Sequence, residues 1–138
     1  MRLGIVASRF NEEISGALLE RARAAAHKLG INDCTVVRVP GALEIPVALQ
    51  WLAQSGRFDA LVAVGCVIRG DTHHFEVVAN ESARGLMEVA LQFGIPVANG
   101  ILTTEDETQA AARLDKGAEA VQAAAEMAQL KAKLGEDR

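Results

Sequence analysis

The regular alternation of two hydrophobic patterns is the feature that most restricts the fold of this 138-residue chain. Four continuous apolar runs have the length and β-branched content of buried strands, at residues 3–7, 35–39, 60–68 and 96–102. Between and after them lie helical patterns, at about residues 12–29, 45–54, 75–93, 104–113 and 116–133. Strands that are apolar on both faces belong to a parallel sheet covered by helices on both sides. The alternation therefore predicts an α/β fold, a three-layer αβα sandwich around a four-stranded parallel sheet.

Capping residues predict where several helices begin and end. Gly30 is placed to end the first helix, and Pro46 suits the first turn of the second. The sequence Thr-Glu-Asp-Glu at residues 104–107 matches a capping box and predicts the start of the fourth helix. The chain length fits a single domain spanning residues 1–138.

Charge, hydropathy and motif content argue against several functional classes. The formal net charge is −4 without a basic run, which argues against nucleic-acid binding. No apolar run reaches the roughly 18 residues needed to span a bilayer, and no signal peptide is recognisable, so we expect a cytoplasmic protein that does not bind membranes. Cys34 and Cys66 lie outside metal-binding spacings, and we expect both to be buried free thiols. The Walker, GxGxxG, GxSxG and HExxH motifs are absent, which argues against nucleotide-driven chemistry.

Residues unusual for a strand or a helix follow each predicted strand. They lie at residues 8–11, 40–44, 70–74, and at 99–100 with 103–104. In parallel α/β sheets, ligands bind beyond the carboxyl ends of the strands, where the strand order switches. We therefore expect these four loops to meet at one rim and to form the binding site.

The third loop combines features that suit phosphate binding and proton transfer. Unpaired backbone N–H groups at a helix N-terminus attract an anion, and Thr72 adds a hydroxyl. His74 is placed about one turn into the helix, as a general acid or base or merely as a surface residue. His73 points away from that line and is expected to be solvated.

Three further residues have both a functional and a structural interpretation. Phe10 either stacks on a flat heterocycle or acts as a hydrophobic staple for the first helix. Glu44 either accepts hydrogen bonds from ligand hydroxyls or stabilises a helix N-terminus. Arg113 either binds phosphate or stabilises a helix C-terminus. Position alone does not separate these alternatives.

Five segments carry a family resemblance, in order RFN at residues 9–11, VPGALEIP at 39–46, GCVIRGDTHHF at 65–75, NE at 80–81 and GILTTE at 100–105. Together they closely resemble lumazine synthase, the penultimate enzyme of riboflavin biosynthesis, and the resemblance covers nearly the whole chain. It implies a flavodoxin-like sandwich and a reaction that needs no cofactor or metal. In that reaction, 5-amino-6-(D-ribitylamino)uracil condenses with 3,4-dihydroxy-2-butanone 4-phosphate to give 6,7-dimethyl-8-ribityllumazine, phosphate and water.

The resemblance also implies a role for each matching residue. His74 would transfer protons, and Phe10 would stack on the pyrimidine. The remaining pyrimidine and ribityl contacts would come from Ala42, Leu43, Glu44, Cys66, Val67, Ile68 and Asn99. The phosphate would be held by Asp71, Thr72, Arg113 and Lys116.

Three departures from the family pattern bear on assembly. Asn99 stands where the family often has a Phe that contributes to a neighbouring subunit's site, so we expect an amide hydrogen bond in place of stacking. The sequence begins at its first strand, without a segment that many members add to an adjacent subunit's sheet, and residues 113–116 form a shorter loop than usual. The resemblance implies a homo-oligomer, a pentamer with shared sites and with riboflavin synthase as a candidate partner. The departures favour isolated or paired rings over a closed shell.

The last predicted helix is rich in alanine. One stripe of this helix, which we expect to contact a neighbouring subunit, contains Ala118, Val121, Ala125 and Ala128.

Two functions compete with catalysis. One is a flavodoxin-like binding or signalling module, although Ser8, Arg9 and Phe10 stand where a receiver domain has aspartates. The other is a family member retained as a structural shell or as a lumazine-binding protein. Turnover separates both from an enzyme.

Overall fold

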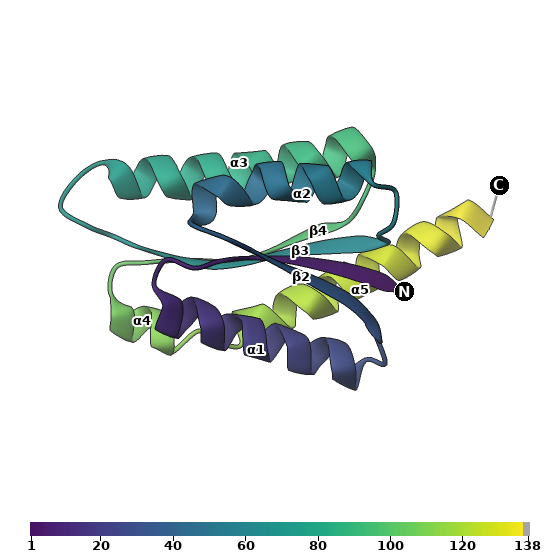
Figure 1. Cartoon of the computed structure of the whole chain (residues 1–138), viewed down its shortest axis with the longest axis horizontal. Helices are drawn as coiled ribbons and strands as arrows, with labels where there is room; N and C mark the ends of the chain where they lie inside the picture. Colours follow the sequence, from purple (N-terminus) through teal and green to yellow (C-terminus); the bar gives the residue numbers. More distant parts are fainter. Residues whose placement is uncertain (137–138) are drawn as a thin grey trace.

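A four-stranded parallel sheet forms the middle layer of the computed structural model, which describes residues 1–136. Its strands lie in the order β2-β1-β3-β4, with bounds β1 (Arg2–Ser8), β2 (Asp33–Val39), β3 (Ala60–Ile68) and β4 (Val97–Thr104). One face carries α2 (Ile45–Gln54) and α3 (His74–Phe93), and the other carries α1 (Glu12–Lys28), α4 (Glu107–Ala111) and α5 (Lys116–Glu136) (Figure 1). A short 3₁₀ helix, η1 (Ala42–Glu44), precedes α2. The predicted three-layer sandwich is confirmed.

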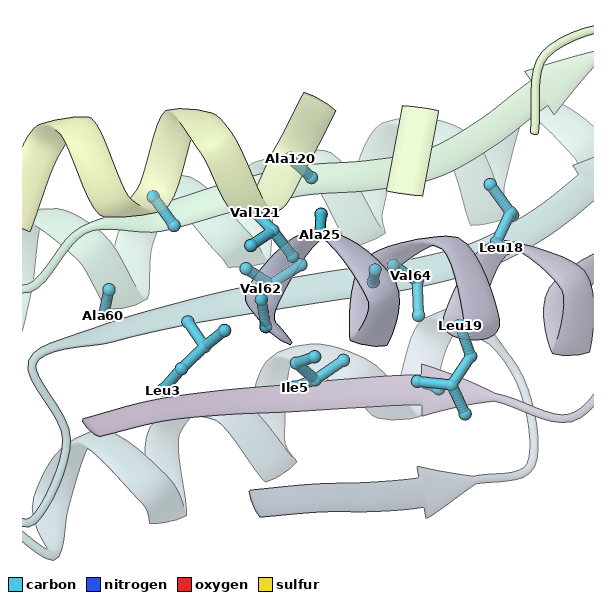
Figure 2. Packing of buried hydrophobic residues seen from close by; sticks show 14 of the residues in the cluster. Leu3, Ile5, Leu18, Leu19, Ala25, Ala60, Val62, Val64, Ala120 and Val121 are labelled. Carbon is cyan, nitrogen blue, oxygen red and sulfur yellow. The ribbon is translucent and has the colours of Figure 1, made fainter. Parts of the chain in front are cut away.

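The sheet separates two hydrophobic clusters. Leu3 and Ile5 of β1 and Val62 and Val64 of β3 face α1 and α5, and all four are fully buried (Figure 2). The alternate residues of the same strands, such as Leu61, pack against α2 and α3. Each such side chain contributes about 1.5–3 kcal/mol relative to remaining exposed. Because both faces are covered, the strands are apolar throughout, as the sequence predicted.

The Ala-rich stripe of α5 packs within the chain, so its predicted role in contacting a neighbouring subunit is wrong. Val121, Ala125 and Ala128 are buried against the cluster that includes α1. A Cβ placed on Gly117 would lie 2.2 Å from the carbonyl oxygen of Leu18, so α5 meets α1 in backbone contact. Small residues are needed for this close approach, and they serve the fold rather than assembly.

Most helix boundaries match the sequence, but the start of α4 does not. Gly30 adopts a φ of 78° just after α1, and Pro46 lies in the first turn of α2. In contrast, Thr104 completes β4 by pairing with Ile68, and Asp106 caps α4 by accepting a 2.8 Å hydrogen bond from the Gln109 N–H. The predicted capping box is therefore wrong because strand pairing continues through its first residue.

The cysteines differ in burial. Both thiols are free, and Cys66 is buried in the central strand β3. Cys34 is only half-buried, because β2 is an edge strand, which corrects the expectation of two buried thiols. Within residues 1–136, none of the helices is long and apolar enough to cross a membrane.

Candidate active site

The carboxyl ends of β1, β2 and β3 enclose a cavity of about 310 Å³, which we call the β1–β3 cavity. Its walls come from three sequence motifs that lie far apart in the chain. The lining residues are Phe10, Asn11, Gly41, Ala42, Leu43, Glu44, Cys66, Val67, Ile68, His74 and Val78. The predicted convergence of these loops is therefore confirmed for three of the four strands.

Phe10 forms an exposed wall of this cavity. Its backbone N–H donates to the Pro40 carbonyl at 2.9 Å, which ties the loop after β1 to the end of β2. A Cβ on Gly41 would lie 2.8 Å from the Phe10 ring, so the ring packs directly over that glycine. The side chain remains 63% exposed, a state that suits stacking on a flat ligand better than the closed contact of a hydrophobic staple.

Asn11 lies in a loop that the sequence predicted to be at the site, but the prediction gave it no role. It adopts the left-handed conformation with φ 57°, and its side-chain Nδ2 donates to the Cys66 carbonyl at 3.1 Å. Its own carbonyl accepts from the N–H groups of Ile14 and Ser15 at the start of α1. Asparagine is one of the few residues that tolerate this backbone conformation, which is the signal that could have identified it. The contact fixes the position of Phe10 relative to β3.

Glu44 stabilises the start of the helix η1 with one carboxylate oxygen, and its second oxygen can accept a hydrogen bond from a ligand. Its Oε1 accepts from the Gly41 N–H at 2.8 Å, which closes the turn that begins η1. The residue is half-buried and lines the cavity beside Leu43. Its other carboxylate oxygen is free to accept from a ligand hydroxyl, so the two interpretations of Glu44 are compatible.

The loop between β3 and α3 places His74 on the cavity and leaves His73 outside its lining. α3 starts at His74, one residue earlier than predicted. His74 is therefore the first residue of the helix and does not lie one turn into it. Thr72 Oγ1 accepts from the His74 N–H at 3.3 Å, which leaves the hydroxyl hydrogen available to an anion. Asp71 lies exposed in the same loop.

The other predicted residues line a second, separate cavity of about 810 Å³, which we call the β4–α5 cavity. Asn99, Arg113 and Lys116 all contribute to it, and the two cavities share no lining residue. Arg113 donates to the Gln109 carbonyl at 2.8 Å. Asn99 lies in the middle of β4, where it pairs with Ala63 of β3, so its predicted place at the end of the strand is wrong. The reason is that β4 extends to Thr104.

One residue that lines the β1–β3 cavity has a strongly shifted pKa. Burial, with a smaller contribution from the Glu107 carboxylate, raises the pKa of the Cys66 thiol to about 11, so this thiol is uncharged near neutral pH. Within residues 1–136, no group of three or more His, Cys, Asp or Glu side chains is arranged to hold a metal ion.

Comparison with known proteins identifies the family. The model of the family described as 6,7-dimethyl-8-ribityllumazine synthase matches residues 1–132. The chain belongs to the lumazine synthase family.

Lumazine synthases from several bacteria are similar to the chain over most of their length. The protein of that name from Nitrosomonas europaea is 60% identical over 93% of this chain and 80% of its own. Those from Paraburkholderia phymatum and Cupriavidus necator are 55% and 54% identical, over 94% and 97% of this chain and 77% and 82% of theirs. A de novo designed Rossmann fold protein is 16% identical with a TM-score of 0.44, over 80% of this chain and 90% of its own.

Membership in the lumazine synthase family confirms the resemblance drawn from the five motifs. It implies small-molecule substrates and an oligomeric assembly. The geometry adds that one chain separates the residues matching the family's site into two cavities, with Phe10 and His74 in one and Arg113 in the other.

Proposed function

We propose that the chain catalyses the condensation of 5-amino-6-(D-ribitylamino)uracil with 3,4-dihydroxy-2-butanone 4-phosphate. The products are 6,7-dimethyl-8-ribityllumazine, phosphate and water, in the penultimate step of riboflavin biosynthesis. The observation that carries the proposal is the β1–β3 cavity, which brings a flat aromatic wall, a carboxylate and a histidine together from three distant motifs. Family membership supplies the identity of the reaction.

The lining of the cavity suggests how each substrate binds. The exposed Phe10 ring would stack on the pyrimidine, whose edge would meet the strand end formed by Cys66, Val67 and Ile68. Ala42, Leu43 and Glu44 would follow the ribityl chain, with the free Glu44 oxygen accepting from its hydroxyls. Asp71 and Thr72 would hold the phosphate where the N–H groups of the first turn of α3 point outward.

His74 is the proposed catalytic residue because every step moves a proton. The substrate amine attacks the ketone and loses water to form an imine, and phosphate then leaves by elimination. The ribitylamino nitrogen closes the ring on the remaining carbonyl, and a second water is lost. An imidazole at the first turn of α3 can donate and accept these protons near neutral pH, a contribution of ~10²–10⁴-fold in typical enzymes, while holding the two substrates together supplies further acceleration.

A complete site requires two neighbouring subunits in this proposal. Asn99, Arg113 and Lys116 would reach the Phe10 and His74 side of the next chain, because within their own chain they line the separate β4–α5 cavity. Such a head-to-tail contact closes into a ring, and the family resemblance favours five subunits. We further propose that residues 1–138 form one domain and that the protein acts in the cytoplasm. Riboflavin synthase is the proposed partner, which would consume the lumazine product.

Incubation with both substrates tests the function. We expect the fluorescent lumazine product and stoichiometric phosphate release, each dependent on both substrates. Binding of the pyrimidine substrate with no product above the uncatalysed rate would contradict the proposal and would favour the binding-module or structural-shell alternatives. A His74→Ala variant serves as the matched control for spontaneous imine chemistry.

A further inference from the structure

Arg69 makes an unusual set of contacts just after β3. Its Nε lies 2.7 Å from Glu105 Oε2, and a second guanidinium nitrogen bonds Glu76 Oε1. The guanidinium carbon lies 4.4 Å from the centroid of the Phe75 ring. The Arg69 backbone N–H also donates to the Thr104 carbonyl at 2.9 Å. The Arg69 side chain therefore contacts Phe75 and Glu76 of α3 and Glu105 of the segment after β4.

These contacts join the two ends of the exposed loop at residues 70–73. Phe75 and Glu76 lie in the first turn of α3, after the loop, whereas Arg69 precedes it. Glu105 belongs to the segment after β4 and anchors the guanidinium to the sheet. Glu76 Oε2 is buried without a hydrogen-bond partner, so Arg69 is the group that compensates this carboxylate. The same hydrogen bond lowers the pKa of Glu76 below its usual value.

We propose that Arg69 is a positioning residue that holds the loop at residues 70–73 in the conformation that binds the phosphate of the four-carbon substrate. This inference rests on the proposed function, which assigns Asp71 and Thr72 to that phosphate. Arg69 acts through the loop and its two carboxylate partners. A planar guanidinium is required, because it stacks on Phe75 while its edge bonds Glu76 and Glu105. A lysine ammonium cannot make all three contacts.

Arg84 provides a matched control in the same helix. It also contacts two carboxylates, with Nε 2.6 Å from Glu81 Oε2 and a second nitrogen bonded to Glu88. All three residues lie within α3, three or four positions apart, so this network joins no loop to another element. Exposed pairs of this kind contribute little to stability. Arg84→Met therefore reproduces the charge change of Arg69→Met without affecting the loop.

The experiment measures the dissociation constant of inorganic phosphate by titration, and the KM of each substrate, for the parent chain and both Met variants. We expect Arg69→Met to weaken phosphate binding and to raise the KM of the phosphate substrate by ~10-fold, with the KM of the pyrimidine substrate nearly unchanged. Arg69→Lys should not restore binding. Arg84→Met should match the parent. Equal phosphate constants for Arg69→Met and Arg84→Met would overturn the proposal.

Glu105→Ala separates positioning from simple attraction of the phosphate. Removing a negative charge strengthens anion binding if only the local field matters, whereas loss of the Glu105 anchor weakens it if positioning matters. We expect weaker binding, by a few-fold, and stronger binding would overturn the proposal. The two hypotheses also fail separately. A parent chain that binds phosphate without turnover counts against the proposed function alone, and one that does not bind phosphate overturns the role of Arg69.

Discussion

The two cavities are built in different ways, although both lie along the same sheet. The β1–β3 cavity brings together loops from three separate βα units, and backbone hydrogen bonds such as Phe10 N–H to Pro40 O fix its walls. The β4–α5 cavity is lined by one continuous stretch of chain, residues 99–119, and Arg113 and Lys116 are exposed there. Hydrogen bonds between loops therefore fix the shape of the β1–β3 cavity. The β4–α5 cavity instead presents exposed charged side chains at the surface of the chain.

This difference assigns separate tasks to the cavities. The β1–β3 cavity contains the aromatic wall and the histidine, the groups to which we assign pyrimidine binding and proton transfer in the proposed function. The β4–α5 cavity contains the cations Arg113 and Lys116 beside the carboxylates Glu105, Asp115 and Glu119, and its lining contains no aromatic residue and no histidine. In the proposed function, each cavity supplies half of a site that two subunits share. Substitutions in the two cavities should therefore have different kinetic signatures.

The largest effect is expected at His74. His74→Ala removes the proposed proton-transfer group from the β1–β3 cavity and should lower kcat by ~10²-fold with little change in KM. His73→Ala should change kcat far less, because His73 lies outside the cavity lining. Steady-state rates of lumazine formation measure both variants. Equal losses at the two histidines would contradict the assignment.

A smaller effect should separate the two substrates. Phe10→Ala removes the stacking surface and should raise the KM of the pyrimidine substrate, whereas Thr72→Val removes a hydroxyl and should raise the KM of the phosphate substrate. Base–aromatic stacking contributes ~1–3 kcal/mol in single-strand binding proteins, and a hydrogen bond to a charged group ~1.5–3 kcal/mol, so the change should be about fivefold or more for Phe10→Ala and about tenfold or more for Thr72→Val. Reversed changes in the two KM values would mean that the subsites are exchanged.

Mixing variants tests whether the cavities meet across a subunit interface. Phe10→Ala and Arg113→Ala chains, each assayed well below its raised KM so that it is strongly impaired, should regain activity when they are unfolded and reassembled together. The recovery should approach a quarter of the parent activity, because a quarter of randomly formed interfaces join two intact halves. Phe10→Ala mixed with His74→Ala is the control, since every chain then carries a defect in its β1–β3 cavity and no fully intact site can form. Sedimentation velocity of the parent gives the assembly size. A fully active monomer would rule out the shared site.

The β1–β3 cavity could be predicted from sequence because each of its motifs follows an unmistakable buried strand. Parallel strands bring their carboxyl ends together, and Phe10, Glu44 and His74 do line one cavity, while their roles in binding and catalysis stay predictions. Asn11 was missed because its contribution depends on a left-handed backbone and a hydrogen bond to Cys66, a residue distant in the chain. Periodicity contains no information on such a contact.

The region after β4 was predicted less well. The residues at 103–107 satisfy both a strand ending and a capping box, and pairing with β3 determines which is formed. The stripe of α5 was assigned to a subunit contact because small residues suit any close packing, and only the structure shows that α1 occupies that side. Both errors arise where one local pattern fits two tertiary environments.

An electrostatic prediction concerns the Cys66 thiol of the β1–β3 cavity, and its smallest part comes from a carboxylate at the start of α4. Burial raises the pKa of Cys66 to about 11, and the carboxylate of Glu107 at the start of α4 adds to this effect. The native state therefore keeps the thiol protonated at a pH where the unfolded thiol ionises. The free energy of unfolding should consequently fall as the pH rises from about 9 to 11, and Cys66→Ala should remove this part of the decline.

Glu107→Gln should lower the pKa of Cys66 slightly, because the charge contributes less than burial does. Thiolate absorbance in the ultraviolet measures this in a Cys34→Ala background, and the chain contains no tyrosine whose ionisation would overlap the signal. Glu119→Gln, which removes an equal charge from α5, is the matched control. Equal shifts in the two variants would indicate a general field of the protein. A shift confined to Glu107→Gln would show that the charge at the start of α4 acts specifically on Cys66 in the β1–β3 cavity.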